Sequence, residues 1–355
     1  MKPQLGIIEG YYGTPWSWEA RAAQVSYLKP HGYEFFTYAP KADAFLRKRW
    51  QESHPPEVAD ELRKLSAHCA AQGVRFGVGL SPYEIYRDFG DDEKAALARK
   101  LAELDSFGVQ DLGILFDDMR GDLAGLAQTQ ADIIHWIAER SKATRIIMCP
   151  TYYSDDPLLD RAFGARPTGY LSVLGAKLDS TIEMFWTGEE VCSREYTPGH
   201  LERVTYEMGR RPFLWDNYPV NDGQRMSPYL YIRAFTGRPA AIGPHLAAHA
   251  VNPALQPVLT RIPALTLARS YRDGDAYQYG EAFRLAAGDV LGEDLGAMVS
   301  RHIGMLNDTG LDKLDPDTAA RLRARYAAID HDGAREIVAW LDGSYVITRE
   351  MMEEA

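Results

Sequence analysis

The stretch that decides the fold is residues 75–118, which read RFGVGLSPYEIYRDFGDDEKAALARKLAELDSFGVQDLGILFDD. Its two ends, Arg75–Leu80 and Asp111–Phe116, are short apolar runs with the length of a buried strand. Between them, Asp92–Phe107 has apolar residues at helical spacing, and Gly108 follows as a typical helix end. The stretch is therefore predicted to form one strand–helix–strand unit with parallel strands.

The same alternation continues on both sides of this unit. Further strands are predicted at Leu5–Glu9, Glu34–Tyr38, Arg145–Cys149, Ile182–Phe185, Pro212–Trp215 and Ala247–Val251. Helices are predicted at Trp16–Leu28, Pro56–Gln72, Leu123–Lys142, Pro198–Gly209 and Val258–Tyr271. Eight strands over about 270 residues are typical of a closed (β/α)8 TIM barrel, which we expect for residues 1–272. An open doubly wound sheet is the alternative, but no G-x-G-x-x-G motif follows the first strand.

The pattern changes after Tyr271. Gly274 and Gly280 mark a break, and only helical periods follow them. Asp315-Pro316 resembles the N-cap and first residue of a helix. Residues 281–355 are therefore expected to form an α-helical C-terminal region. This region would pack on the barrel or on a partner subunit, and a homodimer through these helices is one expected assembly.

Composition excludes several classes of function. The 39 Lys and Arg residues against 50 Asp and Glu residues give a net charge of −11, which disfavours binding to nucleic acid or to anionic lipid. A hydrophobic content of 46% excludes a disordered chain. The three cysteines are widely spaced and fit neither a disulfide framework nor a zinc site. Neither a signal peptide nor a membrane-spanning run is recognised, so a cytoplasmic location is expected.

The residues that follow the predicted strands are the candidate site, because a barrel builds its active site from the loops at these ends. In chain order they are Glu9–Gly13, Ala39–Lys41, Ser81–Tyr83, Asp117-Asp118, Pro150–Tyr153, Trp186–Gly188, Asp216-Asn217 and Asn252-Pro253. Carboxylates, amides, a lysine and aromatic rings suit a sugar, which presents hydroxyls and apolar ring faces. Glycine-rich phosphate loops and clustered metal ligands are not found at these ends, so neither a cofactor nor a metal is expected.

The pair Asp117-Asp118 is the most informative element. Two adjacent carboxylates at the end of a buried strand repel each other and resist desolvation, so their pKa values are expected to separate. Adjacent strand residues face opposite ways, and both side chains reach one pocket only if the chain leaves strand geometry near Asp118. The alternative is that one aspartate caps the next helix or pairs with an arginine such as Arg120.

Six motifs in order along residues 5–270 resemble the catalytic barrel of glycoside hydrolase family 84, the O-GlcNAcases and related β-N-acetylglucosaminidases. They are Glu9–Trp16, Tyr38–Lys41, Leu115–Asp118, Cys149–Thr151 with Tyr153, Trp186–Gly188, and Trp215–Asn217 with Asp222. The resemblance implies a retaining hydrolase that removes terminal β-linked N-acetylglucosamine from a glycoprotein, glycopeptide or oligosaccharide. It also implies substrate-assisted catalysis, in which the acetamido oxygen attacks the anomeric carbon and forms an oxazoline.

The resemblance further implies a role for each matched residue. Asp117 would orient the acetamido N–H, and Asp118 would protonate the leaving oxygen and then deprotonate water. Tyr153 would bind the acetamido oxygen. The implied substrate contacts are Gly10, Lys41, Tyr153, Trp186, Trp215, Asn217, Asp222 and Asn252, with the two tryptophans walling the acetamido pocket.

Tyr83 departs from this pattern, because a smaller residue is expected there in relatives. It would narrow the entrance or contact the aglycone, the group attached to the sugar. Two other functions stay open at this point: a catalytically inactive barrel that binds glycan, and a metal-dependent barrel enzyme that uses the aspartate pair.

Overall fold

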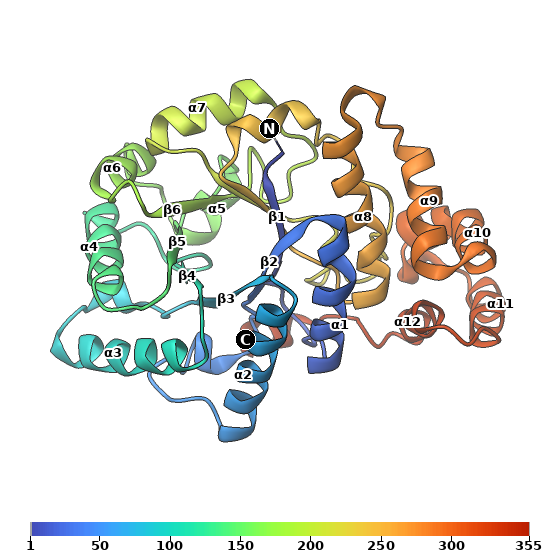
Figure 1. Ribbon diagram of the computed structural model, residues 1–355, viewed down its shortest axis with the longest axis horizontal. Coiled ribbons are helices and arrows are strands. Elements are labelled where there is room, and N and C mark those ends of the chain that lie inside the picture. The colour runs from blue at the N-terminus through green and yellow to red at the C-terminus, as the bar shows by residue number, and fades with distance from the viewer. Residues whose placement is uncertain (1, 355) are drawn as a thin grey trace.

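The computed structural model describes residues 2–354 and contains a closed barrel of eight parallel strands (Figure 1). Gln4 of the first strand pairs with Ala248 of the last, which closes the sheet. The predicted (β/α)8 barrel is confirmed, and the open doubly wound alternative is wrong. The strands are β1 (Gln4–Glu9), β2 (Tyr33–Tyr38), β3 (Arg75–Leu80), β4 (Asp111–Leu115), β5 (Arg145–Cys149), β6 (Glu183–Trp186), β7 (Phe213–Asp216) and β8 (Ala248–Val251).

Helices surround the barrel and connect its strands. They are α1 (Trp18–Leu28), α2 (Pro56–Ala71), α3 (Asp91–Ser106), α4 (Leu126–Ala138), α5 (Pro157–Phe163), α6 (Tyr170–Lys177), α7 (Pro198–Met208) and α8 (Pro257–Asp273). Short 3-10 turns include η2 (Ala44–Leu46), η3 (Ile85–Arg87) and η4 (Ala240–His245). The sequence pattern did not predict α5 and α6, because helices of 7 and 8 residues are too short to display a clear period.

A series of aromatic rings in the core leads from β2 to the C-terminal end of the barrel. The ring centroids of Phe35 and Phe213 are 5.4 Å apart, and those of Phe213 and Phe185 are 4.8 Å apart. The next ring along is Trp215, 5.2 Å from Phe185 and edge-on to it. Such pairs add about 0.5–1.5 kcal/mol each beyond their burial, so the position of Trp215 is well determined by the core.

The C-terminal helices form a second layer beside α8 (Figure 1). They are α9 (Tyr279–Leu291), α10 (Glu293–Ile303), α11 (Pro316–Ala327) and α12 (Asp332–Leu341). The side chain of Asp315 accepts a hydrogen bond from the Thr318 N–H at 2.9 Å, so the predicted helix start at this position is confirmed. Leu259 and Ile262 of α8 pack in one apolar cluster with Trp340 of α12.

A buried carboxylate joins this layer to the barrel. Glu336 of α12 accepts hydrogen bonds from the N–H groups of Val258 and Leu259 at 2.8 and 2.9 Å, in the first turn of α8. These N–H groups have no partner inside their own helix, so an acidic side chain there stabilises the helix start. Burial raises the pKa of Glu336 to about 7.

The end of the chain returns to the barrel mouth, where Figure 1 marks the C-terminus. Ile347 is buried, and its N–H donates to the Ser227 hydroxyl at 3.1 Å. The last helix, α13 (Arg349–Glu354), follows at once and brings Met352 to the cavity described below. The C-terminal region therefore contributes directly to the barrel's open end.

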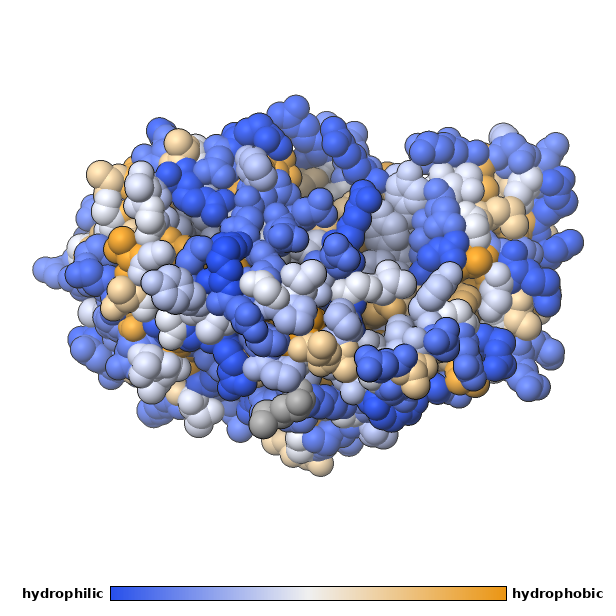
Figure 2. Space-filling view, turned by 90° about the horizontal axis from the view of Figure 1, so that it is seen from above, coloured by the Kyte–Doolittle hydropathy of each residue, from blue (hydrophilic) through white to orange (hydrophobic). Residues whose placement is uncertain are grey.

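The surface and the cysteines add two further findings. Within residues 2–354, no helix has both the length and the apolar character needed to cross a bilayer. The three cysteines are free, with Cys192 exposed and the other two buried. The face seen in Figure 2 is mainly hydrophilic, and its hydrophobic residues lie in small groups.

Candidate active site

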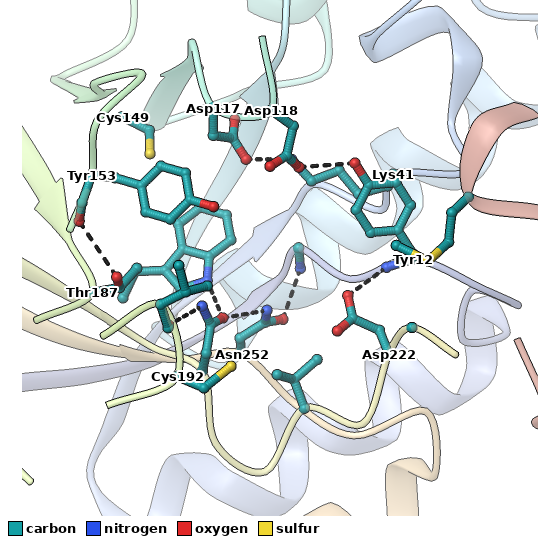
Figure 3. Close-up of a pocket in the computed structure, with 17 residues that line it drawn as sticks. Tyr12, Lys41, Asp117, Asp118, Cys149, Tyr153, Thr187, Cys192, Asp222 and Asn252 are labelled. Carbon is teal, nitrogen blue, oxygen red and sulfur yellow. Dashed lines mark hydrogen bonds and ion pairs between the residues drawn. The ribbon is translucent and has the colours of Figure 1, made fainter. Parts of the chain in front are cut away.

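The C-terminal ends of the strands surround a cavity of about 690 Å³ (Figure 3). Every predicted site residue except Trp186 lines it. The full lining is Gly10, Tyr12, Lys41, Asp117, Asp118, Cys149, Tyr153, Thr187, Val191, Cys192, Trp215, Asn217, Val220, Asp222, Gly223, Asn252 and Met352. Closure of the barrel thus gathers side chains that lie more than 200 residues apart in the sequence.

The two adjacent aspartates share this cavity because the chain leaves strand geometry after the end of β4. The strand ends at Leu115, and Asp118 has φ of +54°, in the left-handed region. The sequence required this departure if both side chains were to reach one pocket, and the structure meets that condition. Asp and Asn adopt that conformation more readily than other non-glycine residues. Arg120 pairs instead with Asp122, at 2.5 Å, so the alternative of a structural ion pair with Arg120 is wrong.

Lys41 holds the first aspartate in place. Its buried ammonium group is in close contact with Oδ2 of Asp117 and lies 3.5 Å from Oδ2 of Asp118. Burial lowers the pKa of Lys41, but the two carboxylates outweigh this and leave it above its ordinary value. The other oxygen of Asp117, Oδ1, is buried and has no hydrogen-bond partner among the described residues. Asp117 thus has one oxygen held by a cation and one free acceptor.

The side chain of Asp118 is more exposed to solvent than that of Asp117, and several neighbouring groups influence its charge. Its side chain is 25% exposed, and Oδ2 accepts a hydrogen bond from the Tyr12 hydroxyl at 2.8 Å. Burial raises the pKa of Asp118, but the positive charges of Lys41 and Arg47 and the Tyr12 hydrogen bond outweigh it, so the pKa lies below its ordinary value. This electrostatic balance favours the ionised form. It is opposite to the expectation that Asp118 is the protonated member of the pair.

Tyr12 connects two carboxylates on opposite sides of the cavity (Figure 3). Its hydroxyl bonds to Asp118, and its backbone N–H donates to Oδ2 of Asp222 at 2.9 Å. Burial raises the pKa of Asp222 to about 6, although the hydrogen bond from Tyr12 acts in the opposite direction. Tyr12 belongs to the first motif, but the sequence reasoning assigned it no role.

Two asparagines form a hydrogen-bonded chain along the cavity wall that lies opposite the aspartate pair (Figure 3). The N–H of Gly10 donates to Oδ1 of Asn252 at 3.2 Å, and Nδ2 of Asn252 donates to Oδ1 of Asn217 at 2.9 Å. The indole N–H of Trp215 donates to the same Asn217 oxygen at 3.0 Å, and Nδ2 of Asn217 donates to the Val191 carbonyl at 2.8 Å. The orientation of both amides is therefore set by protein partners.

Gly10 is required by the position of Trp215. A Cβ atom at residue 10 would lie 2.3 Å from Cζ2 of the indole ring. Gly10→Ala is expected to displace that wall and to lower kcat/KM for the substrate proposed below by about 10²-fold, the effect of a misplacement near 1 Å. Gly280→Ala is the matched control, since a Cβ there meets no atom within 4 Å. Equal kcat/KM in the two variants would contradict this role.

Trp186 lies outside the cavity, so the prediction that it walls the pocket is wrong. Its side chain is fully buried, and its indole N–H donates to Nε2 of His200 at 3.2 Å, on α7. Successive strand residues face opposite ways, and the last residue of β6 points toward the helical layer. The next residue, Thr187, lines the cavity instead, and its N–H donates to the Tyr153 carbonyl at 2.9 Å.

Several cavity residues were not predicted as site residues. Tyr12, Cys149 and Thr187 lie within the quoted motifs, so their adjacency to strand ends could have identified them. Val191, Cys192, Val220, Gly223 and Met352 carry no such signal, because only the folded chain brings them to this end. Tyr83 is 37% exposed and lies outside the cavity lining.

The described residues contain no cluster of three or more His, Cys, Asp or Glu side chains suited to a metal ion. His249, for example, is buried between Asp216 and Tyr271. Its Nε2 lies 3.0 Å from the carboxylate of Asp216 and its Nδ1 lies 2.8 Å from the hydroxyl of Tyr271. This network supports the strand end that precedes Asn217.

Comparison with known proteins gives consistent matches. The sequence model of the beta-N-acetylglucosaminidase family matches residues 5–301. The chain is 28% identical over 276 residues to protein O-GlcNAcase of Rattus norvegicus and, equally, to that of Mus musculus. The match covers 75% of this chain but spans only 30% of the length of these curated relatives. A solved mutant of the Thermobaculum terrenum O-GlcNAc hydrolase aligns with a TM-score of 0.80 and 28% identity, over 99% of this chain and 86% of that one.

Proposed function

The chain belongs to the beta-N-acetylglucosaminidase family, and from this premise we propose that it hydrolyses terminal β-linked N-acetylglucosamine. The proposed substrates are glycoproteins of the O-GlcNAc type, glycopeptides or oligosaccharides that end in this sugar. The observation that carries the proposal is the cavity itself, which combines an aspartate pair with amides, a lysine and an aromatic wall. The presence of both carboxylates in one cavity disfavours the alternative of an inactive glycan-binding barrel.

In the proposed first step, the substrate supplies its own nucleophile. The acetamido oxygen attacks the anomeric carbon while the bond to the leaving oxygen breaks, and the product is an oxazoline. Oδ1 of Asp117 accepts the acetamido N–H, a role supported by the absence of any described partner on this buried oxygen. Lys41 on Oδ2 keeps the carboxylate aligned and balances its charge. The negative charge of Asp117 stabilises the positive charge that develops on the acetamido group.

Asp118 is the proposed proton donor and acceptor. It gives its proton to the leaving oxygen, then takes a proton from the water that opens the oxazoline, so the β-configuration is retained. The lowered pKa of Asp118 must rise before the first step. A substrate covering the exposed quarter of the side chain would cause this, because desolvation disfavours the charged form.

The direct test is an assay with 4-methylumbelliferyl β-N-acetylglucosaminide. We expect turnover with retained configuration, observed by NMR of the first-formed sugar, and no turnover of the matching β-glucoside, which lacks the acetamido group. We also expect EDTA to leave the rate unchanged. Binding of a thiazoline inhibitor without turnover would support the inactive barrel, and EDTA-sensitive turnover would support a metal-dependent enzyme.

A further inference from the structure

Arg47 is a buried cation next to the cavity, and none of the described side chains places a carboxylate in direct contact with it. It follows η2, and the residue is 6% exposed. Its Nε and Nη1 are buried and have no hydrogen-bond partner among the described residues, whose carboxylates all lie more than 4.0 Å from its nitrogens. Burying an unpaired charge costs several kcal/mol. Such a cost in a loop that also carries Lys41 indicates a function beyond packing.

Two tyrosine rings receive this cation. The guanidinium carbon lies 5.7 Å from the centre of the Tyr12 ring and 5.7 Å from that of Tyr83, within the range of cation–π attraction. The ammonium group of Lys41 lies 5.9 Å from the Tyr12 ring. Tyr12 is the residue whose hydroxyl bonds to Asp118. Arg47 is thus connected to that carboxylate through one intervening side chain.

The charges around Asp118 show what Arg47 adds. The carboxylate of Asp117 opposes the ionisation of Asp118, and Lys41 is the positive group nearest to Asp118. The other titratable groups facing this part of the cavity are Tyr12, Tyr153, Cys149 and Asp222. Among the described residues, Lys41 and Arg47 are the two positive charges that act to lower the pKa of Asp118.

We propose that Arg47 is a positioning residue for proton transfer. It holds the Tyr12 ring so that the Tyr12 hydroxyl stays bonded to Asp118, and its positive charge, together with that of Lys41, acts on the Asp118 carboxylate. This inference rests on the proposed hydrolase function. It also accounts for the finding that no described carboxylate is in direct contact with the guanidinium, because such a carboxylate would cancel the effect of this charge on Asp118. Tyr83 then serves as the outer ring that keeps water from this cation.

The inference predicts a shift in the pH dependence of catalysis. The Arg47 charge acts to lower the pKa of Asp118. A neutral residue at this position removes that effect, so the pKa rises and Asp118 stays protonated to higher pH. Because the alkaline limb of kcat/KM reports an acid that must be protonated in the free enzyme, Arg47→Met is expected to move this limb upward by about one pH unit.

The experiment compares pH profiles of kcat/KM on 4-methylumbelliferyl β-N-acetylglucosaminide. Arg47→Met and Arg47→Gln should both show the upward shift, whereas Arg47→Lys, which keeps the charge, should retain the wild-type limb. The matched control is Arg49→Met, since Arg49 is exposed and pairs with exposed Glu52. Thermal unfolding of each variant confirms that it is folded.

Tyr12→Phe provides a test that does not alter Arg47. It keeps the aromatic ring but removes the hydrogen bond to Asp118, so its alkaline limb should also move upward. An unmoved limb in the folded neutral variants, or in Tyr12→Phe, would overturn the inference. An equal shift in Arg47→Lys would do the same, because charge would not be the cause. A wild-type protein without turnover would instead refute the proposed function.

Discussion

Asp118→Asn is expected to lower kcat/KM toward a β-N-acetylglucosaminide with a poor leaving group by about 10²–10⁴-fold, the usual contribution of a general acid. An amide cannot supply the proton that the leaving oxygen needs. Asparagine also tolerates the left-handed backbone at this position, where φ is +54°, so the fold should persist. The loss should therefore be chemical and not structural.

Leaving-group dependence distinguishes this role from general damage to the site. Activated leaving groups need little protonation, so the loss in Asp118→Asn should shrink as the leaving-group pKa falls. Asp122→Asn is the matched control, because Asp122 is exposed in the same loop and pairs with Arg120. A loss of equal size for every leaving group would remove Asp118 from the acid role.

Asp117→Asn is expected to lower kcat/KM by about 10²–10³-fold, the usual cost of losing one preorganised electrostatic group. Oδ1 is the free acceptor proposed for the acetamido N–H, and a neutral amide cannot stabilise the charge that develops there. The substitution also weakens the close contact with Lys41.

The leaving-group dependence of Asp117→Asn should differ from that of Asp118→Asn. Its loss should be similar for good and poor leaving groups, because the defect lies in formation of the oxazoline. In the wild type, successive fluorination of the acetamido methyl group should slow turnover, since it weakens the attacking oxygen. A wild-type rate in Asp117→Asn would refute substrate-assisted catalysis by this residue.

Strand-end positions explain why most of the site could be predicted. Residues such as Asp117 and Asn252 stand directly after apolar runs, and barrel closure brings such positions to one end. Trp186 shows where this reasoning fails. At a strand end a shift of one residue reverses the direction of a side chain, and the sequence does not reveal that register.

The sequence alone determined three properties of this protein, through its residue types, the order of its motifs and its eight alternating strands and helices. These properties are the barrel fold, the family and the aspartate pair, which can be predicted because they depend on local patterns along the chain. Only the tertiary structure decided the charge state favoured at Asp118, the bridging role of Tyr12 and the arrival of Met352 at the cavity. These depend on distances between segments far apart in the sequence, and electrostatic interactions vary steeply with such distances and with burial.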